Sequence, residues 1–452
     1  MSPKFMILLF FQVCLLMKNC ISIIFPMKTN IPYFNSSNII PYYISRQFYS
    51  NIELGSPKQN VLLLINLKEN SFYLDKIDKN IKINDINSQY DYCNSSSSQL
   101  LTEFDKNYGK FYSGAFISED FYFYENLNKP KKLFKNITFF LSTKDCIDLC
   151  FTAGIGLQKK SKEKGFIEIL KDANYTKSYD WFLYYTNNKN DNEEIVLIIG
   201  QKPHEYFPKS YSENQILSMN SYCSYTYLKW GILFNKIYIN NQSFSDLLDS
   251  EINFNYASLL IPYDYWDYIS KIYFNEYINL NICSILTEPD NKMRYFSCDK
   301  NKFNKKDISK APNIYFYSVQ FKYTFEIKGE DLFELKNDKY YFLLFSQTFT
   351  YSWILGKPFF KKYPFLYNVE TKTISFYNPN IPYEVSNKKI NYKNKYILII
   401  IILIFILILS LIFCIFAICK NHRHRKIRSN ELEDEFVYKP QDNTNNINSN
   451  NI

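Results

Sequence analysis

The stretch that decides the fold of this chain is residues 48–74, which read FYSNIELGSPKQNVLLLINLKENSFYL. Glycine, serine and proline at 55–57 predict a tight turn between two strands. The strand after the turn, 61–65, is apolar at every position, and such a run bounded by turn residues is typical of a strand buried on both faces. A loop and a further short strand at 71–74 follow. The pattern predicts a β-sheet built into a large hydrophobic core.

Length and composition favour a mainly β fold with two domains. The chain has 452 residues, of which 46% are hydrophobic and 19% aromatic, so sizeable cores can form. Tyrosine and phenylalanine dominate the aromatic residues, and both favour strands. The formal net charge of +9 would suit an anionic partner, but the lysines are scattered and no recognition motif is present. We therefore expect no nucleic-acid partner.

Two apolar segments predict the membrane topology. Residues 5–17 follow Lys4 and are too short for a comfortable span, so we interpret 1–24 as a secretory signal peptide, with a buried N-terminal strand as the alternative. Residues 396–419 are apolar almost throughout and long enough to cross a bilayer as one helix. Their C-terminal flank is the richer in lysine and arginine, so the positive-inside rule places the tail, 420–452, in the cytosol. We expect a single-pass type I membrane protein of the secretory pathway or cell surface, with a luminal or extracellular ectodomain.

The cysteine and asparagine patterns agree with an oxidising compartment. Six cysteines lie outside the predicted signal peptide, 1–24, and the apolar segment 396–419: Cys93, Cys146, Cys150, Cys223, Cys283 and Cys298. Their even number predicts three disulfides, whose pairing the spacing leaves open. Metal binding is the weaker alternative because His204 is the one histidine of the predicted ectodomain, and we expect no metal and no other cofactor. Motifs for N-glycosylation begin at Asn35, Asn94, Asn136, Asn174 and Asn241.

Further motifs follow in the first half of the chain. Residues 108–120 read YGKFYSGAFISED, which predicts an aromatic β-hairpin. Residues 152–157 read TAGIGL, and residues 194–200 read EIVLIIG, an apolar strand that ends in glycine. A polar stretch with two prolines, 202–219, then marks a boundary between two lobes.

The second half repeats the same kinds of segment. Residues 228–244 read LKWGILFNKIYINNQSF, residues 252–262 read INFNYASLLIP, and residues 353–368 read WILGKPFFKKYPFLYN. In this order, and with 48–74 and 108–120 before them, these motifs resemble the pepsin-like aspartic proteases, the plasmepsin branch in particular. The likeness extends over roughly residues 43–380.

The resemblance implies a bilobal double-β-barrel ectodomain, with lobes at 43–205 and 220–380, followed by one transmembrane helix. It places Tyr108 in the flap hairpin over the cleft between the lobes. It also implies a disulfide in the second lobe between Cys283 and Cys298. The two catalytic aspartate positions of the family fall on Asn66 and Phe254 in this sequence.

Neither residue can do the work of an aspartate. Pepsin-like hydrolysis uses two carboxylates that share one proton and hold a water between them. Asn66 cannot accept a proton near neutral pH, and Phe254 has no hydrogen-bonding atom. We therefore expect a pseudoprotease that binds an extended peptide or a protein partner in the interlobe cleft. The alternatives are an active aspartic-type endopeptidase with non-standard active-site residues, and a structural or adhesive surface glycoprotein.

The topology is tested by protease protection. In sealed vesicles derived from the secretory pathway, added protease should trim the tail, 420–452, and leave residues 25–395 intact, because the bilayer shields the lumen. Fragments are identified by mass spectrometry, and detergent-opened vesicles serve as the control. Digestion of the ectodomain in vesicles that are still sealed would reverse the orientation.

Overall fold

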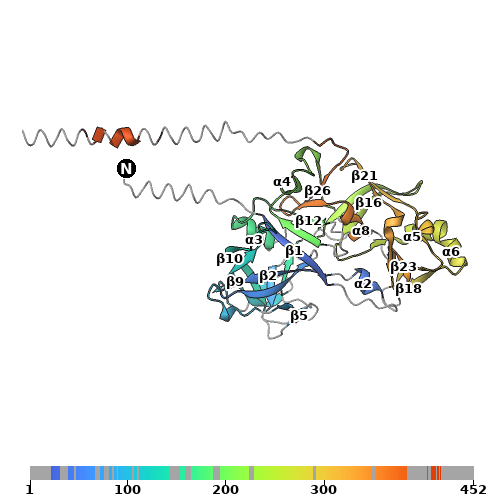
Figure 1. The fold of residues 1–452 in the computed structure, drawn as a ribbon, viewed down its shortest axis with the longest axis horizontal. Helices are drawn as coiled ribbons and strands as arrows, with labels where there is room; N and C mark the ends of the chain where they lie inside the picture. Colours follow the sequence, from blue (N-terminus) through green and yellow to red (C-terminus); the bar gives the residue numbers. More distant parts are fainter. Residues whose placement is uncertain are drawn as a thin grey trace, which may run out of the picture. The chain divides into compact units, whose positions relative to one another are not determined.

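The computed structural model divides the chain into two units, Met1–Glu384 and Val385–Ile452, and each unit is considered by itself. The residues that it describes are 22–30, 39–44, 47–66, 72–75, 81–83, 86–88, 90–103, 106–108, 111–142, 153–157, 164–186, 194–222, 229–288, 292–347, 352–383, 405, 409–413, 415–416 and 418. Within the first unit the described chain is mainly β-strand, as the composition predicts (Figure 1).

Most strands of the first unit belong to two large sheets. In the 14-stranded sheet the order is β14 (Ile216–Asn220), β26 (Thr373–Tyr377), β25 (Phe365–Asn368), β12 (Asp180–Thr186), β13 (Glu194–Ile199), β1 (Ile23–Asn30), β2 (Gln47–Leu54), β3 (Gln59–Asn66), β11 (Ala153–Gly156), β4 (Phe72–Asp75), β10 (Lys132–Ser142), β9 (Phe111–Phe123) and β7 (Gln99–Leu100), with β8 (Lys106–Tyr108) paired to β9.

In the 10-stranded sheet the order is β18 (Cys283–Thr287), β19 (Met293–Asp299), β23 (Lys339–Gln347), β17 (Leu259–Ile261), β24 (Trp353–Leu355), β16 (Gln242–Ile252), β15 (Gly231–Ile239), β20 (Ile314–Ser318) and β21 (Tyr323–Ile327), with β22 (Phe333–Lys336) paired to β23. Strands β5 (Ile81–Ile83) and β6 (Ile86–Ser88) form a separate pair.

The helices are short and connect the strands. They are α2 (Ile40–Ile44), η1 (Tyr92–Asn94), α3 (Phe166–Asp172), α4 (Pro203–Tyr206), η2 (Glu213–Gln215), α5 (Tyr263–Ile269), η3 (Ser270–Phe274), α6 (Asn275–Asn279), α7 (Lys305–Ile308), η4 (Gly329–Leu332) and α8 (Lys357–Lys362).

The opening stretch folds as its residues predict. Strands β2 and β3 form an antiparallel hairpin around a turn in which Gly55 has a φ of +84°, a conformation that glycine adopts without strain. The Val61 side chain and those of the next four residues of β3 are buried, because this strand lies in the interior of the sheet with a neighbour on each side.

One three-strand arrangement occurs twice. In the first half of the unit, β11 lies between β3 and β4, parallel to β3 and antiparallel to β4. In the second half, β24 lies between β16 and β17, parallel to β16 and antiparallel to β17. Each arrangement begins with a hairpin, β2–β3 or β15–β16, and each continues into a parallel partner, β10 or β23. The two halves therefore repeat one topology.

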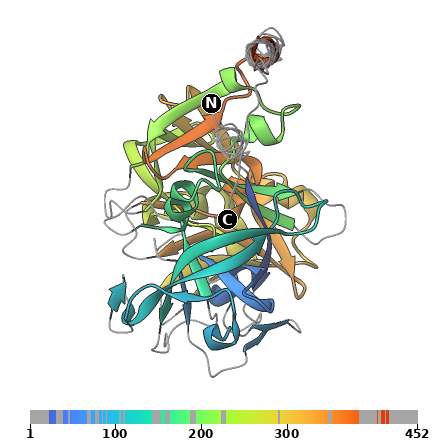
Figure 2. The same ribbon diagram turned by 90° about the vertical axis from the view of Figure 1, so that its left-hand side faces the viewer.

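The two halves also share a sheet. Strands β25 and β26 come from the end of the predicted second lobe, yet β25 pairs with β12 of the first lobe and β26 pairs with β14. Figure 2 shows this sheet from the side of the long β9–β10 hairpin, which is drawn in teal. The segments 43–205 and 220–380 are thus joined through backbone hydrogen bonds as well as side chains.

The N-terminal region forms two elements that the sequence analysis does not predict. Strand β1 lies inside the sheet between β13 and β2 (Figure 1), and α2 follows it. Ile23 and Ile24 are buried in β1, which therefore begins two residues inside the predicted signal peptide, 1–24. Only five residues, 18–22, separate β1 from the apolar leader in sequence, and the pairing with β13 and β2 shows that residues 23–30 form a strand.

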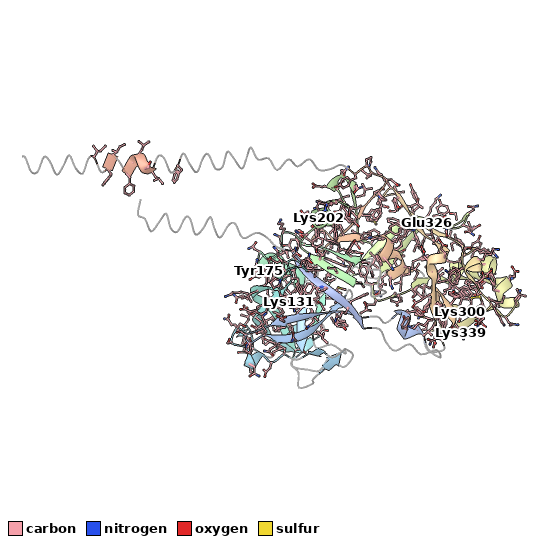
Figure 3. The ribbon with its side chains drawn as sticks, viewed as in Figure 1. Lys131, Tyr175, Lys202, Lys300, Glu326 and Lys339 are labelled. Carbon is pink, nitrogen blue, oxygen red and sulfur yellow. A yellow bond between two sulfur atoms is a disulfide. The ribbon has the colours of Figure 1, made fainter. Side chains whose placement is uncertain are left out.

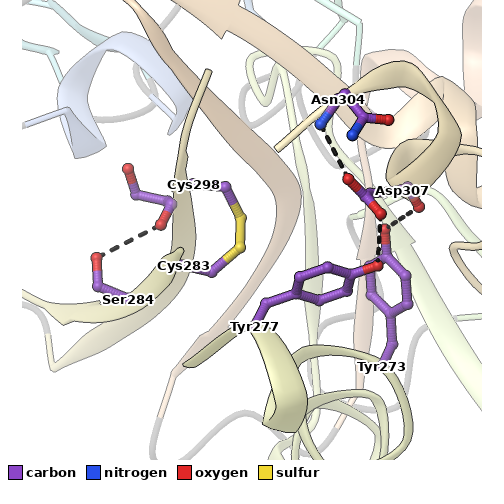
Figure 4. Close-up of a disulfide and its surroundings, with 8 residues drawn as sticks. Tyr273, Tyr277, Cys283, Ser284, Cys298, Asn304 and Asp307 are labelled. Atoms are coloured by element: carbon purple, nitrogen blue, oxygen red, sulfur yellow. Dashed lines mark hydrogen bonds between the residues drawn. A yellow bond between two sulfur atoms is a disulfide. The ribbon is translucent and has the colours of Figure 1, made fainter. Parts of the chain in front are cut away.

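The predicted second-lobe disulfide is confirmed. Cys283 of β18 and Cys298 of β19 face each other across the strand pair and are bonded (Figure 4). Beside them the hydroxyl of Tyr277 donates to Oδ1 of Asp307 at 3.0 Å, and that of Tyr273 donates to the Asp307 carbonyl at 2.7 Å. The disulfide links β18, an edge strand of the 10-stranded sheet, covalently to its neighbour β19.

The expectation of three disulfides is not met at Cys93. This thiol is free and exposed on the short surface helix η1. Cys146, Cys150 and Cys223 lie outside the described residues.

Among the described residues no helix is both long and apolar enough to cross a membrane. Most of the predicted span, 396–419, and all of the tail, 420–452, lie outside them, as do residues 1–21 of the predicted signal peptide.

Removing the confirmed disulfide tests its contribution to stability. The double variant Cys283→Ser/Cys298→Ser should lose about 3 kcal/mol of unfolding free energy, because the bond closes a loop whose ends are 15 residues apart. Chemical denaturation of the ectodomain measures the loss, and Cys93→Ser should leave the stability unchanged. Non-reducing peptide mapping that joins Cys283 or Cys298 to any other cysteine would contradict the pairing.

Candidate functional site

The first loop of the candidate site begins where β3 ends. Asn66 is the last residue of that strand, and its backbone pairs with that of Gly156 in β11. Of the Asn66 side chain and of residues 67–71 nothing is described. The structure therefore places the predicted position at the exit of a buried strand, beside the glycine that ends the middle strand.

The second loop, residues 253–258, is held by backbone hydrogen bonds. The amide of Asn253 donates to the Leu355 carbonyl at 3.0 Å, and the amide of Lys357 donates to the Tyr256 carbonyl at 2.8 Å. Between these bonds lies Gly356, where an added Cβ would stand 2.0 Å from the Ser258 carbonyl oxygen. Only glycine permits this approach, so the route of the loop depends on Gly356.

The N-terminal helix also contacts this loop. The amide of Ala257 donates to the carbonyl of Tyr43, in α2, at 2.7 Å. The Tyr43 ring is fully buried, 5.4 Å from the ring of Phe345 in β23. An element that precedes β2 in the chain thus packs on the second half of the unit.

Phe254 lies in the core. Its side chain is 2% exposed, and its ring centroid lies 4.5 Å from that of Phe360, 6.3 Å from that of Trp181 and 6.1 Å from that of Tyr367. Trp181 and Tyr367 stack on each other at 4.2 Å. Phe254 thus belongs to an aromatic cluster made of residues from both halves, and a charged group at its place would be desolvated.

Trp230 connects the surroundings of the two loops. Its buried indole Nε1 donates to the carbonyl of Leu157, the residue after Gly156, at 2.6 Å. Its own carbonyl accepts from the amide of Ile252 at 2.9 Å. Trp230 therefore connects Leu157, which follows the glycine paired with Asn66, to Ile252, the residue before Asn253.

Sequence inspection overlooked Asn253. Its side chain is 3% exposed, and its Oδ1 accepts from the amide of Asn255 at 3.2 Å, which shapes the start of the loop. A signal was present, because the pair Ile-Asn ends β3 as Ile65-Asn66 and recurs as Ile252-Asn253. A buried amide at a strand exit is a candidate binding group.

Charged groups near the loops are paired. Glu251, at the end of β16, accepts from Lys229 at 2.6 Å. Burial, and next to it the Glu251 carboxylate, raise the pKa of the Tyr256 hydroxyl to about 12, so this tyrosine is neutral at physiological pH. Away from the loops, the largely buried Lys131 pairs with Glu53 at 2.9 Å and the exposed Lys300 pairs with Asp338 at 3.1 Å; Figure 3 labels both lysines.

The predicted hairpin at 108–120 is present. Strand β8 pairs with β9, and the backbones of Tyr108 and Phe111 are partners in this pairing. Gly114 in β9 passes so close to β10 that an added Cβ would lie 2.3 Å from the Leu141 carbonyl. The backbone of Tyr108 is thus at the hairpin tip, while its side chain is outside the described residues.

The remaining predicted positions behave as surface or structural residues. Asn94, Asn136, Asn174 and Asn241 are exposed, as glycosylation requires, and Asn35 lies outside the described residues. His204 Nδ1 lies 2.7 Å from the hydroxyl of Tyr377, far along the chain from either loop. In the described part of the chain no group of histidine, cysteine, aspartate and glutamate side chains could hold a metal ion.

No protein-family model matches the chain, and no curated protein matches it. The assignment of function therefore depends on the residues and the geometry above.

The aromatic cluster predicts a large effect at Phe254. Phe254→Ala should cost about 3–5 kcal/mol of unfolding free energy, because it leaves a cavity among large side chains. Phe254→Asp should destabilise more at pH 7 than near pH 4, because burial raises the pKa of the new carboxyl and its charging penalises only the folded state.

Chemical denaturation at both pH values measures the two losses. Tyr222→Ala is the control, since Tyr222 is 51% exposed and its removal should change stability by less than about 0.5 kcal/mol. If Phe254→Ala lowered the unfolding free energy as little as the control does, packing of the Phe254 ring in the aromatic cluster would not stabilise the protein.

Proposed function

We propose that this protein is a membrane-anchored, catalytically inactive relative of the pepsin-like aspartic proteases, and that it binds an extended peptide or a protein partner between its two halves. The proposal is carried by one observation: the repeated three-strand arrangement positions two loops, and no carboxylate stands at their expected catalytic positions, Asn66 and Phe254.

The internal repeat supports a double-barrel, bilobal fold. A pepsin-like fold needs two copies of one strand topology, with a loop in each copy that brings a functional residue to the centre. The described chain has the two copies, a glycine at or just after the end of each middle strand, and a shared sheet between the halves. Sequence motifs that resemble the family include β3, β4 and β11 in the first half and β17 and β24 in the second, all of them strands of the repeat.

The chemistry supports inactivity. Water attack on a peptide bond in this family needs one ionised and one protonated carboxyl group within a few ångström. An asparagine amide neither gains nor loses a proton between about pH 4 and 7. Phe254 is surrounded by aromatic rings, which stabilise a neutral side chain and would oppose a charge.

Main-chain pairing supplies a means of binding. Within the described part of the chain, β8 has β9 as its one strand partner, so an extended peptide could add along the hairpin and be held by backbone hydrogen bonds. Side-chain pockets would then set which peptide is chosen. This mode needs the hairpin and the loops but no catalytic group.

Anchorage follows from the sequence. The apolar segment 396–419, the basic residues after it and the leader at 1–24 support a type I protein of the secretory pathway or cell surface. The Cys283–Cys298 disulfide and the exposed glycosylation motifs are in keeping with that compartment.

The proposal predicts the absence of hydrolysis and the presence of binding. The purified ectodomain, incubated with a combinatorial library of extended peptides between about pH 4 and 7, should produce no cleavage fragments in mass spectrometry. The same library passed over immobilised ectodomain should leave a retained subset of peptides. Cleavage by the wild-type protein would establish the active-endopeptidase alternative, and capture of no peptide would favour a structural or adhesive role.

Restoring both aspartates at the predicted positions should not restore activity. The double variant Asn66→Asp/Phe254→Asp should remain inactive in the library assay. It would bury one carboxylate in the aromatic cluster, and a displacement of about 1 Å in such a pair can cost roughly 100-fold in rate. Circular dichroism checks that the variant is folded. New fragments from this variant alone would show that loops with Leu67, Lys68, Asn255 and Tyr256 still permit a working pair.

A further inference from the structure

The pairing of the strands offers a different counterpart for Asn66. In the first half, Ile65 pairs with Ile155 and Asn66 with Gly156. In the second half, Ile252 pairs with Leu355, and the next residue, Asn253, donates its amide to the Leu355 carbonyl, one residue before Gly356. In both halves an asparagine therefore leaves the strand beside the glycine of the middle strand.

Counting from the far side of the loop leads to the same pair. Tyr73 pairs with Gly154, two residues before Gly156, and Leu260 pairs with Ile354, two residues before Gly356. Tyr73 and Leu260 each lie seven residues after the asparagine of their own half, so the two loops are equally long. Phe254 is instead enclosed by Trp181 and Phe360 in the core.

We propose that Asn66 and Asn253 are the equivalent positions of the two halves, and that the site binds its ligand through the neutral amide of Asn253. The proposal rests on the proposed function and gives its site a chemistry: an amide suits the carbonyl and N–H groups of a peptide main chain, because it offers both a hydrogen-bond donor and an acceptor.

Trp230 links the two strand exits. Its indole donates to the carbonyl of Leu157, next to Gly156, and its backbone carbonyl accepts from the amide of Ile252, next to Asn253. A single buried residue therefore connects the end of one middle strand to the strand that precedes the second loop.

The side chain of Asn253 has an unused donor. Its Oδ1 is engaged by the Asn255 amide, but within the described part of the chain its Nδ2 donates no hydrogen bond, although the residue is 3% exposed. A peptide carbonyl would satisfy this donor. Because an amide does not titrate, peptide retention should be equal at pH 5 and pH 7.

A double-mutant cycle tests the pairing without any ligand. Asn66→Asp and Asn253→Asp keep the shape of each side chain and add a charge to each. If the two positions face each other, the two new charges repel in the double variant at pH 7. Its unfolding equilibrium constant should then exceed the value expected from adding the two single effects by about threefold or more. The excess should vanish near pH 3, where both carboxyls are protonated.

The matched control cycle combines Asn66→Asp with Asn255→Asp, the same chemical change two residues further along the loop. It should be additive. Additivity of the Asn66–Asn253 cycle at pH 7, or an equal excess in the control cycle, would overturn the pairing.

The ligand chemistry is tested with the combinatorial library of extended peptides. Asn253→Asp keeps the acceptor that holds the Asn255 amide but removes the Nδ2 donor, so retention should fall about tenfold at pH 7. Retention by this variant should recover as pH falls and the carboxyl gains a proton, whereas wild type stays constant. Unchanged retention at pH 7 would overturn the role of Asn253. If wild type retains no peptide, the proposed function fails, and the cycle still decides the pairing.

Discussion

The insertion of one strand between two others, made twice, is the constraint on which this structure depends. A middle strand that is parallel to one neighbour and antiparallel to the other forces the chain between those neighbours to loop around its end. In the second half the loop then runs against Gly356, where no Cβ could fit beneath the Ser258 carbonyl. Backbone pairing and one glycine set the path of the loop, so the path does not require any particular functional side chain.

This independence means that the side chains of the loop can differ without loss of the fold. Two carboxylates at a buried centre are costly, because each must be desolvated and they repel each other. Beside the second loop this chain has Phe254, Phe360, Trp181 and Tyr367, which gain stability from burial and ring packing. These uncharged rings help to hold the two halves together at a place where buried charges would cost stability.

The halves are connected by three kinds of interaction. Strands β25 and β26 carry backbone hydrogen bonds from one half to the other, the aromatic cluster packs across the joint, and Trp230 adds a buried hydrogen bond to Leu157. Helix α2 adds a fourth contact through the Tyr43 carbonyl. A partner bound between the halves would therefore meet two loops that are both anchored at their bases, and such preorganisation lowers the entropy cost of binding.

Local patterns in the sequence were enough for several features. The turn at Gly55, the buried strand β3 and the hairpin at Tyr108 follow from turn residues and apolar runs, which act over a few neighbours. The Cys283–Cys298 pair followed from the family resemblance. Strand β1 could not be predicted in this way, because its apolar residues closely follow those of the leader and only pairing with β13 and β2 shows them to be a strand. The environment of Phe254 and the alignment of Asn253 with Asn66 were likewise decided by the tertiary structure. The rings around Phe254 and the glycine beside Asn253 come from distant parts of the chain, and the register that aligns Asn253 with Asn66 is visible only when the strands are paired.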